Sequence, residues 1–404
     1  MEQLIKQIDR GWLEGAAKTI TFIVTKDCQL ACKYCYLVGK NENERMSFET
    51  AKAVVDYVLD NRDFFNEQSV IWEFIGGEPF IEIELIDKIC DYIKTQMFVK
   101  NHHWFNSYRF NFATNGINYH TAKVQEFIKK NWTHLSIGIT IDGTRKKHDI
   151  NRIYKKSGKG SYDDVLSNIP LWLKQFPTAG TKVTISSADI PYIRESVLHL
   201  YSLGIHEVNI NVVYEDVWAE GDDIKFEEQL LMLADDIIDN GYYKDYVCSF
   251  FTENIGKPMD INSDNRNWCG AGRMLSVDAA GNFYPCTRFA QYSLRTKKAR
   301  MIGNIHEGID RNKVRPFIVL DRIVQSSQEC VHCDVASGCG WCQGENYDIS
   351  ETGTICQRSV AICKMHKARV RANNYYWNKL YRKLELDGES KDSIRKHKHN
   401  PSIC

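Results

Sequence analysis

The sequence predicts an α/β fold with a parallel β-sheet at its centre, followed by a cysteine-rich C-terminal region. Six runs of β-branched and aromatic residues alternate with helical patterns, which is typical of parallel strands joined by helical crossovers. The 14 cysteines are grouped, with three within 28–35 and eight within 269–363. In a reducing compartment, grouped cysteines indicate metal ligands or catalytic groups more often than disulfides.

The six predicted strands are bounded by turn residues and span 19–25, 70–75, 108–113, 135–141, 182–186 and 207–213. Apolar residues at three- and four-residue spacing predict helices at 47–59, 83–95, 121–130, 162–175 and 192–203. Six such units suit an open doubly wound sheet or an incomplete barrel, and periodicity favours neither. Both architectures place ligands at the C-terminal ends of strands, where Cys28, Glu78, Asn115 and Asp142 follow four of the runs.

Composition excludes several classes of protein. Lys+Arg and Asp+Glu both number 52 in the 404 residues, so the chain lacks the basic excess of a dedicated nucleic-acid binder. No stretch approaches the roughly 18 apolar residues of a membrane span. The first residues contain no apolar segment typical of a secretion signal, so we expect a cytoplasmic protein.

The first cysteine group, Cys28-x3-Cys32-x2-Cys35, lies in the loop that leaves the first strand. Three neighbouring thiolates can hold three irons of a four-iron cluster and leave the fourth iron open. A zinc knuckle or three core cysteines are the alternatives, although no fourth Cys or His lies nearby. With Tyr36 after Cys35, the group resembles the signature of the radical S-adenosylmethionine (radical SAM) enzymes.

The resemblance implies a partial (β/α)6 TIM barrel, a cluster held by the catalytic cysteines, and SAM bound at the open iron. One electron from the cluster would cleave SAM to a 5′-deoxyadenosyl radical, which takes hydrogen from the substrate. Family loops that contact SAM match four strand ends here, although Gly-Gly, Asn-Gly and Asp-Gly are also ordinary turn sequences. The implied cofactor-binding residues are Tyr36, Gly76, Gly77, Glu78, Asn115, Thr140 and Arg152, and His148 fits the same pattern.

The C-terminal cysteines resemble the SPASM extension, which holds auxiliary iron–sulfur clusters. The resemblance implies one four-iron cluster on Cys330, Cys333, Cys339 and Cys363, and a second on Cys269, Cys286 and Cys342. The second set counts three cysteines, so one iron would be open. Cys356 is an alternative ligand for either cluster, and a zinc ribbon is the alternative for 330–342. In total we expect SAM and three clusters of the 4Fe–4S type.

The resemblance also indicates a domain order. We expect an N-terminal segment (1–18), the radical SAM barrel (19–213), a connector (214–267), the SPASM domain with a terminal helix (268–385) and a charged tail (386–404). Either the acidic connector or a separate protein is a candidate for binding the leader of a peptide substrate.

Many SPASM enzymes modify peptides or proteins. Sulfatase maturases carry an Asp base after their Tyr-Pro-Cys motif, whereas this chain has Thr287, which is no base near neutral pH. An open auxiliary iron would suit a peptide thiol. The segments around Arg288 and Cys363 resemble maturases of ribosomal peptides with Cys-x3 repeats, of the freyrasin-forming (ranthipeptide) type.

We therefore expect an enzyme that forms sulfur-to-carbon thioethers in a ribosomally synthesised, Cys-rich precursor peptide. A flavodoxin or ferredoxin is the expected electron donor, and neither a nucleic acid nor a membrane is an expected partner. The alternatives are a carbon–carbon crosslink, epimerisation, or sulfatase-type oxidation of Cys or Ser. A simple iron–sulfur electron carrier or scaffold would leave the sequence Gly76-Gly77-Glu78 without a role.

Overall fold

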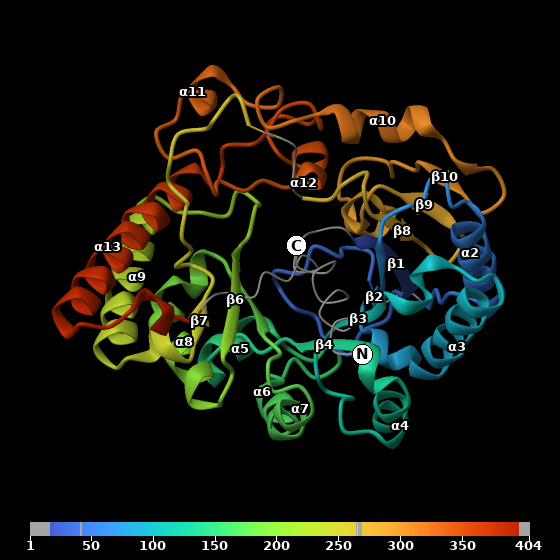
Figure 1. Cartoon of the computed structure of the whole chain (residues 1–404), viewed down its shortest axis with the longest axis horizontal. Helices are drawn as coiled ribbons and strands as arrows, with labels where there is room; N and C mark the ends of the chain where they lie inside the picture. Colours follow the sequence, from blue (N-terminus) through green and yellow to red (C-terminus); the bar gives the residue numbers. More distant parts are fainter. Residues whose placement is uncertain (1–16, 41–42, 264, 266–268, 396–404) are drawn as a thin grey trace.

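The computed structural model describes residues 17–40, 43–263, 265 and 269–395. The predicted segment 1–18 and tail 386–404 therefore lie partly outside the described residues. Six strands form the barrel: β1 (Ala17–Thr25), β2 (Ser69–Gly76), β3 (Tyr108–Thr114), β4 (Leu135–Ile139), β5 (Thr181–Ile185) and β6 (Glu207–Val212). All six predicted strands are present, and neighbours in the order β1-β2-β3-β4 pair in parallel. The partial barrel is confirmed (Figure 1).

An aromatic ladder fixes the register of the first three strands. Phe22, Phe74 and Phe112 are register partners across β1, β2 and β3, and their rings stack with centroids 5.4 and 5.3 Å apart. All three are buried in the main core. A shift by one residue would turn each ring toward the barrel interior, so burial specifies this pairing.

The barrel is interrupted between β4 and β5, which belong to different sheets. The Thr181 hydroxyl joins them: it donates to the carbonyl of Ile139 (2.8 Å) and accepts from the N–H of Ile141 (3.1 Å). A side chain thus replaces the backbone ladder at this point. Strand β6 then pairs with the short β7 (Val247–Cys248).

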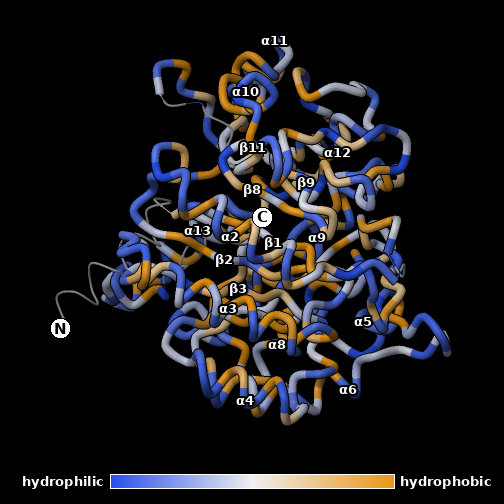
Figure 2. The backbone as a smooth tube through the Cα atoms, turned by 90° about the vertical axis from the view of Figure 1, so that its right-hand side faces the viewer, coloured by the Kyte–Doolittle hydropathy of each residue, from blue (hydrophilic) through white to orange (hydrophobic). Residues whose placement is uncertain are grey.

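The helices surround the strands as α2 (Phe48–Asp60), α3 (Ile83–Val99), α4 (Ala122–Asn131), α5 (Arg145–Asn151), α6 (Tyr162–Leu166), α7 (Ile169–Gln175) and α8 (Ile193–Ser202). The prediction of one helix over 162–175 is wrong, because α6 ends at Leu166 and α7 begins at Ile169. Pro170 explains the break, since its ring would clash with the carbonyl of Leu166 in a continuous helix. Helix α5 was not predicted. Figure 2, coloured by residue hydropathy, shows hydrophobic residues in the central strands and at intervals along the surrounding helices.

The C-terminal extension continues the barrel sheet. Its strands are β8 (Leu275–Val277), β9 (Asn282–Tyr284), β10 (Gly303–Asn304) and β11 (Gly308–Ile309), and β8 pairs in parallel with β1. The helices α10 (Arg311–Val319), α11 (Gln328–Val331) and α12 (Gln343–Asp348) follow. The extension therefore covers the free edge of β1 and holds its cysteines next to the barrel.

The acidic region after the barrel forms α9 (Asp222–Asp239), which packs beside the terminal helix α13 (Cys363–Asp387) (Figure 1). Acidic side chains of α9 meet basic ones of α13: Arg371 pairs with Glu227, and Lys379 pairs with Asp235. The charge of the predicted connector thus serves helix packing. In the described chain, no helix combines the length and apolarity needed to cross a bilayer.

Candidate active site

The loop after β1 brings the three cysteines of the predicted SAM cluster into one group. Cys28 is buried, and its sulfur accepts hydrogen bonds from the N–H of Leu30 (3.4 Å) and the amide of Asn115 (3.9 Å). Burial raises the pKa of Cys28 to about 11, and the nearby Cys32 contributes to this rise. Cys35 acts on the pKa of Cys32 in the same direction.

Gly76 and Gly77 pack against this loop. A Cβ atom on Gly76 would lie 2.2 Å from the carbonyl oxygen of Thr25, and one on Gly77 would lie 2.2 Å from that of Asp27. The N–H of Gly77 donates to the Thr25 carbonyl at 2.9 Å. The two glycines are therefore required for the contact between β2 and the cysteine loop, whatever they also contribute to cofactor binding.

Glu78 connects the loops that follow β2 and β3. Its buried carboxylate accepts hydrogen bonds from the Phe80 N–H (3.0 Å), the Thr114 hydroxyl (2.7 Å) and the Asn115 N–H (2.7 Å). Burial raises the pKa of Glu78, and these hydrogen bonds oppose the rise. A carboxylate has about four acceptor positions, so the chain uses three and leaves one for a cationic ligand such as an ammonium group.

Tyr34 was not predicted as a site residue, yet it joins two charged side chains. Its hydroxyl donates to Asp142 and accepts from Arg152 at 2.9 Å. Burial tends to raise the pKa of Asp142, but the charges of Lys147 and Arg152 outweigh it, so the pKa is lowered and the carboxylate is ionised. Tyr34 lies within the cysteine motif, whose spacing carries no information about this residue.

His148 contacts the backbone of the predicted residue Arg152 through the Ser161 hydroxyl. Its Nδ1 accepts from the Asp142 N–H (3.3 Å), so the proton is on Nε2, which lies 3.0 Å from the Ser161 hydroxyl. That hydroxyl donates to the carbonyl of Arg152 at 2.8 Å. Burial and the charge of Arg152 lower the pKa of His148 to about 3. A neutral histidine therefore positions the backbone of Arg152.

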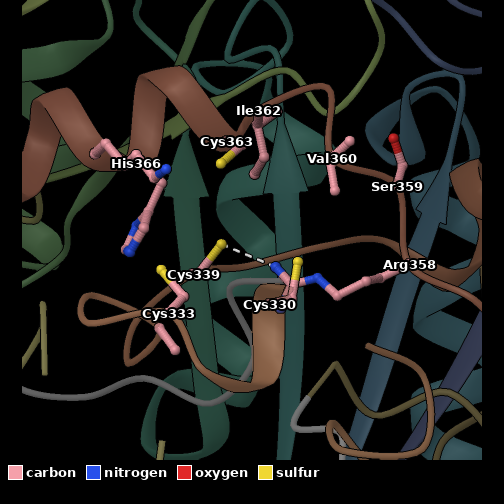
Figure 3. Close-up of a pocket in the computed structure, with 11 residues that line it drawn as sticks. Cys330, Cys333, Cys339, Arg358, Ser359, Val360, Ile362, Cys363 and His366 are labelled. Carbon is pink, nitrogen blue, oxygen red and sulfur yellow. Dashed lines mark hydrogen bonds between the residues drawn. The ribbon is translucent and has the colours of Figure 1, made fainter. Parts of the chain in front are cut away.

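The structure brings together the four cysteines that the resemblance assigns to one auxiliary cluster, here called the first auxiliary group. Cys330, Cys333, Cys339 and Cys363 border one cavity, and their sulfur atoms face a common space (Figure 3). Burial raises the pKa of Cys363, and the other three cysteines add to the rise. Cys356, the alternative ligand, is exposed and does not line this cavity.

Arg358 contacts this group directly. It is 5% exposed, donates from Nη2 to the Cys339 sulfur at 2.8 Å (Figure 3), and lies 4.4 Å above the ring of Trp341. A cationic donor stabilises negative charge on sulfur.

The second auxiliary group consists of Cys269, Cys286 and Cys342. Burial raises the pKa of Cys286, and Cys342 and Cys269 add to this rise. All three line a cavity of about 1200 Å³ between the barrel interior and the extension, and Cys35 lines the same cavity. This space brings the SAM-cluster loop and the second auxiliary group together.

Arg288, two residues after Cys286, lines the same cavity and contacts the loop that carries Cys35. Its guanidinium lies 4.2 Å from the ring of Tyr36, which follows Cys35, and donates to Glu215 at 2.9 Å. Glu345 lies 3.9 Å from the same nitrogen. Burial and the charge of Glu215 raise the pKa of Glu345 to about 7.

The predicted cofactor-binding residues fall into two sets. Tyr36, Gly76, Thr140 and Arg152 line the large cavity. Gly77, Glu78 and Asn115 do not line the cavity. They contact the loops that follow β1, β2 and β3. Of the three predicted cluster ligands in this loop, Cys35 lines the cavity, whereas Cys28 and Cys32 do not.

The donor sets fit the iron–sulfur clusters that the resemblance implies. In the described part of the chain, no three Cys, His, Asp or Glu side chains converge on a position for a single metal ion. A four-iron cluster needs no such convergence, because each thiolate binds a different iron. The N–H groups of Leu30, Asn115 and Arg358 directed at cysteine sulfurs suit thiolate ligands.

Residues 22–188 match the Radical SAM superfamily, in agreement with the partial barrel and the first cysteine group. The C-terminal extension shares its fold with the solved structures described below. A match to that superfamily implies SAM and a four-iron cluster as cofactors of the matched region.

Several relatives match most of the chain. An uncharacterised protein of Methanocaldococcus jannaschii is 28% identical over 74% of this chain and 91% of its own length. A radical SAM cyclopropyl synthase of Paramaledivibacter caminithermalis is 20% identical over 91% of this chain and 76% of its own.

Two solved structures share the fold. The enzyme anSMEcpe with bound S-adenosylmethionine superposes with a TM-score of 0.66 at 17% identity, covering 92% of this chain and all of that one. SuiB of Streptococcus suis, bound to its precursor peptide SuiA, has a TM-score of 0.57 at 13% identity and covers 88% and 79%.

Proposed function

We propose that this chain is a peptide maturase that forms thioether bonds between Cys sulfur and carbon in a ribosomally synthesised, Cys-rich precursor peptide. The observation that carries the proposal is the second auxiliary group, which offers three thiols and lines the same cavity as Cys35. A four-iron cluster on three cysteines has one iron free for a substrate thiolate. The cavity is large enough for a peptide segment, and two enzymes of the same fold have been solved with peptides.

The proposed reaction removes two hydrogens for each new bond. When bound, SAM and the clusters supply a 5′-deoxyadenosyl radical that takes a hydrogen atom from carbon, a ligand position for the thiolate, and an acceptor for one electron. The second hydrogen is that of the thiol, which leaves as a proton as the sulfur–carbon bond forms. We further propose a flavodoxin or ferredoxin as the donor of the electron that begins each turn.

The residues of this chain would bind and position the reactants. Glu78 has one acceptor position left for the ammonium group of SAM, and Arg152, held by Tyr34 and His148, faces the cavity. Thr287 lines the cavity at the position where sulfatase maturases have their base. This substitution argues against sulfatase maturation, since a hydroxyl takes no proton near neutral pH.

The test is anaerobic coexpression with a peptide that contains Cys-x3 repeats, followed by intact mass and thiol alkylation. We expect the loss of two hydrogens and one thiol per crosslink, and no change with Cys32→Ala. Unchanged mass with all thiols free would refute thioether formation, and a repeat in deuterated solvent would then detect epimerisation.

Carbon–carbon bond formation is the second candidate, favoured by the cyclopropyl synthase that matches 91% of this chain. Loss of two hydrogens with every thiol still open to alkylation would assign this reaction instead. The same mass spectra therefore separate the two candidates.

A further inference from the structure

The residues on either side of Cys342 both carry buried polar atoms without a partner. Gln343 is 1% exposed, and neither the nitrogen nor the oxygen of its side-chain amide has a hydrogen-bond partner among the described residues. The indole N–H of Trp341, which is 7% exposed, also has none there. Both residues line the large cavity, next to the second auxiliary group.

Such groups are costly unless a ligand satisfies them. A buried donor or acceptor left unpaired costs about 1–3 kcal/mol, and native proteins leave few of them. Gln325 of the same extension gives a partial contrast: it is equally buried and does not line the large cavity, and its amide nitrogen donates to the Ile355 carbonyl at 2.7 Å. Only the oxygen of Gln325 lacks a partner among the described residues, whereas both amide atoms of Gln343 lack one.

The unpaired atoms define the chemistry of the missing partner. The amide of Gln343 offers an N–H and a carbonyl side by side, and the complement of that pair is the C=O and N–H of another amide. A carboxylate or phosphate would leave the Gln343 oxygen unpaired, and a cation would leave its nitrogen unpaired. The indole of Trp341 adds one donor, which suits a second carbonyl.

We propose that Gln343 and Trp341 form a subsite that hydrogen-bonds the main chain of the peptide substrate beside the cysteine to be modified. The inference rests on the proposed function, which it deepens. Neighbouring side chains hold the subsite in place: Arg358 lies 4.4 Å above the ring of Trp341, and Gly344 packs so closely on Arg288 that a Cβ there would lie 2.4 Å from the Arg288 Cβ. Because the contacts are to backbone, the subsite accepts varied residues next to the cysteine.

The experiment measures binding of labelled synthetic peptides to the anaerobically purified holoenzyme by fluorescence anisotropy. One peptide carries Cys-x3 repeats, and matched peptides carry a single N-methyl group at successive amides, which removes one N–H each. The variants are Gln343→Met, which keeps the side-chain length without the amide, and Gln325→Met as the buried control. Trp341→Phe removes one N–H and keeps the ring.

We expect Gln343→Met to bind about tenfold more weakly, because it loses the hydrogen bonds to the main chain. N-methylation next to one cysteine should weaken binding to the wild type by a similar factor and cost Gln343→Met nothing further. Trp341→Phe should lose about fivefold, and Gln325→Met should bind as the wild type does.

Equal losses on N-methylation in wild type and Gln343→Met would overturn the subsite, as would unchanged affinity of Gln343→Met. An altered electron paramagnetic resonance spectrum of Gln343→Met with full peptide affinity would also overturn it and assign the amide to the metal site. If Gln343→Met fails to fold, the N-methyl scan with the wild type decides, because no loss of affinity at any amide beside a cysteine would overturn the subsite. A wild type that modifies no peptide defeats the proposed function itself, which is a different result from a wild type that modifies peptides without sensing N-methylation.

Discussion

Replacing Glu78 with Gln tests whether this carboxylate organises the loops around the cluster site. The carbonyl of Gln can keep the hydrogen bonds from Phe80 and Thr114, but its NH2 group would face the N–H of Asn115, which now donates at 2.7 Å. One charge-assisted hydrogen bond is lost, worth about 1.5–3 kcal/mol, and a buried N–H is left unpaired at a further cost of about 1–3 kcal/mol.

Neutralising a buried carboxylate returns part of this cost, because burial already disfavours the charged form of Glu78. We therefore expect the free energy of unfolding to fall by about 3 kcal/mol. The assay is urea unfolding of the anaerobically purified enzyme at neutral pH, followed by circular dichroism. Glu84→Gln is the control, since Glu84 is 63% exposed in a surface ion pair and its loss should cost under about 1 kcal/mol. A loss below 1 kcal/mol for Glu78→Gln would show that the carboxylate does not hold these loops together.

Three further predictions concern side chains around the proposed cluster sites. The folded-state pKa of His148 is about 3, below its unfolded value of about 6.5, so its contribution to stability is complete above about pH 6.5 and is lost as the pH decreases, by about 2 kcal/mol at pH 5. His148→Gln should therefore make the free energy of unfolding depend less on pH between about 6.5 and 5, and an unchanged slope would contradict the assignment. Arg358→Met removes the hydrogen bond to the Cys339 sulfur and should lower the reduction potential of a cluster bound there, measured by potentiometric titration with electron paramagnetic resonance. The control Arg322→Met, whose guanidinium lies 5.7 Å from the Trp341 ring, should change the potential less, and the reverse order would exclude the hydrogen bond to sulfur as the cause. Cys363→Ala should lose iron relative to wild type and Cys356→Ala should not, by iron assay of the reconstituted protein; iron loss only in Cys356→Ala would exchange their roles.

The sequence predicts the barrel well because burial imposes a period on each strand and helix. The same signal missed the break at Pro170, although a proline four residues after Leu166 is sufficient reason for it. Close cysteine spacing indicates the first cysteine group from local chemistry alone. The sets that join Cys269 to Cys342, or Cys330 to Cys363, came from resemblance, because local spacing does not report which distant segments meet.

Contacts between distant segments explain what sequence reasoning missed. Arg288 and Glu215 are 73 residues apart, and their pairing depends on how the extension sits on the barrel. The unpaired amide of Gln343 is visible only when its surroundings are known. Tyr34 is a different case, because it lies inside the recognised motif but its partners Asp142 and Arg152 come from beyond β4.

The parallel pairing of β1 with β8 has a consequence for synthesis of the protein. Strand β1 leaves the ribosome early, yet its edge partner begins at Leu275, about 250 residues later. At about 5–20 residues per second, that edge waits roughly ten to fifty seconds for its partner. An uncovered strand edge is a template for aggregation. The extension thus completes the barrel as well as adding cysteines to it, and a barrel fragment that ends before β8 would keep this edge exposed permanently.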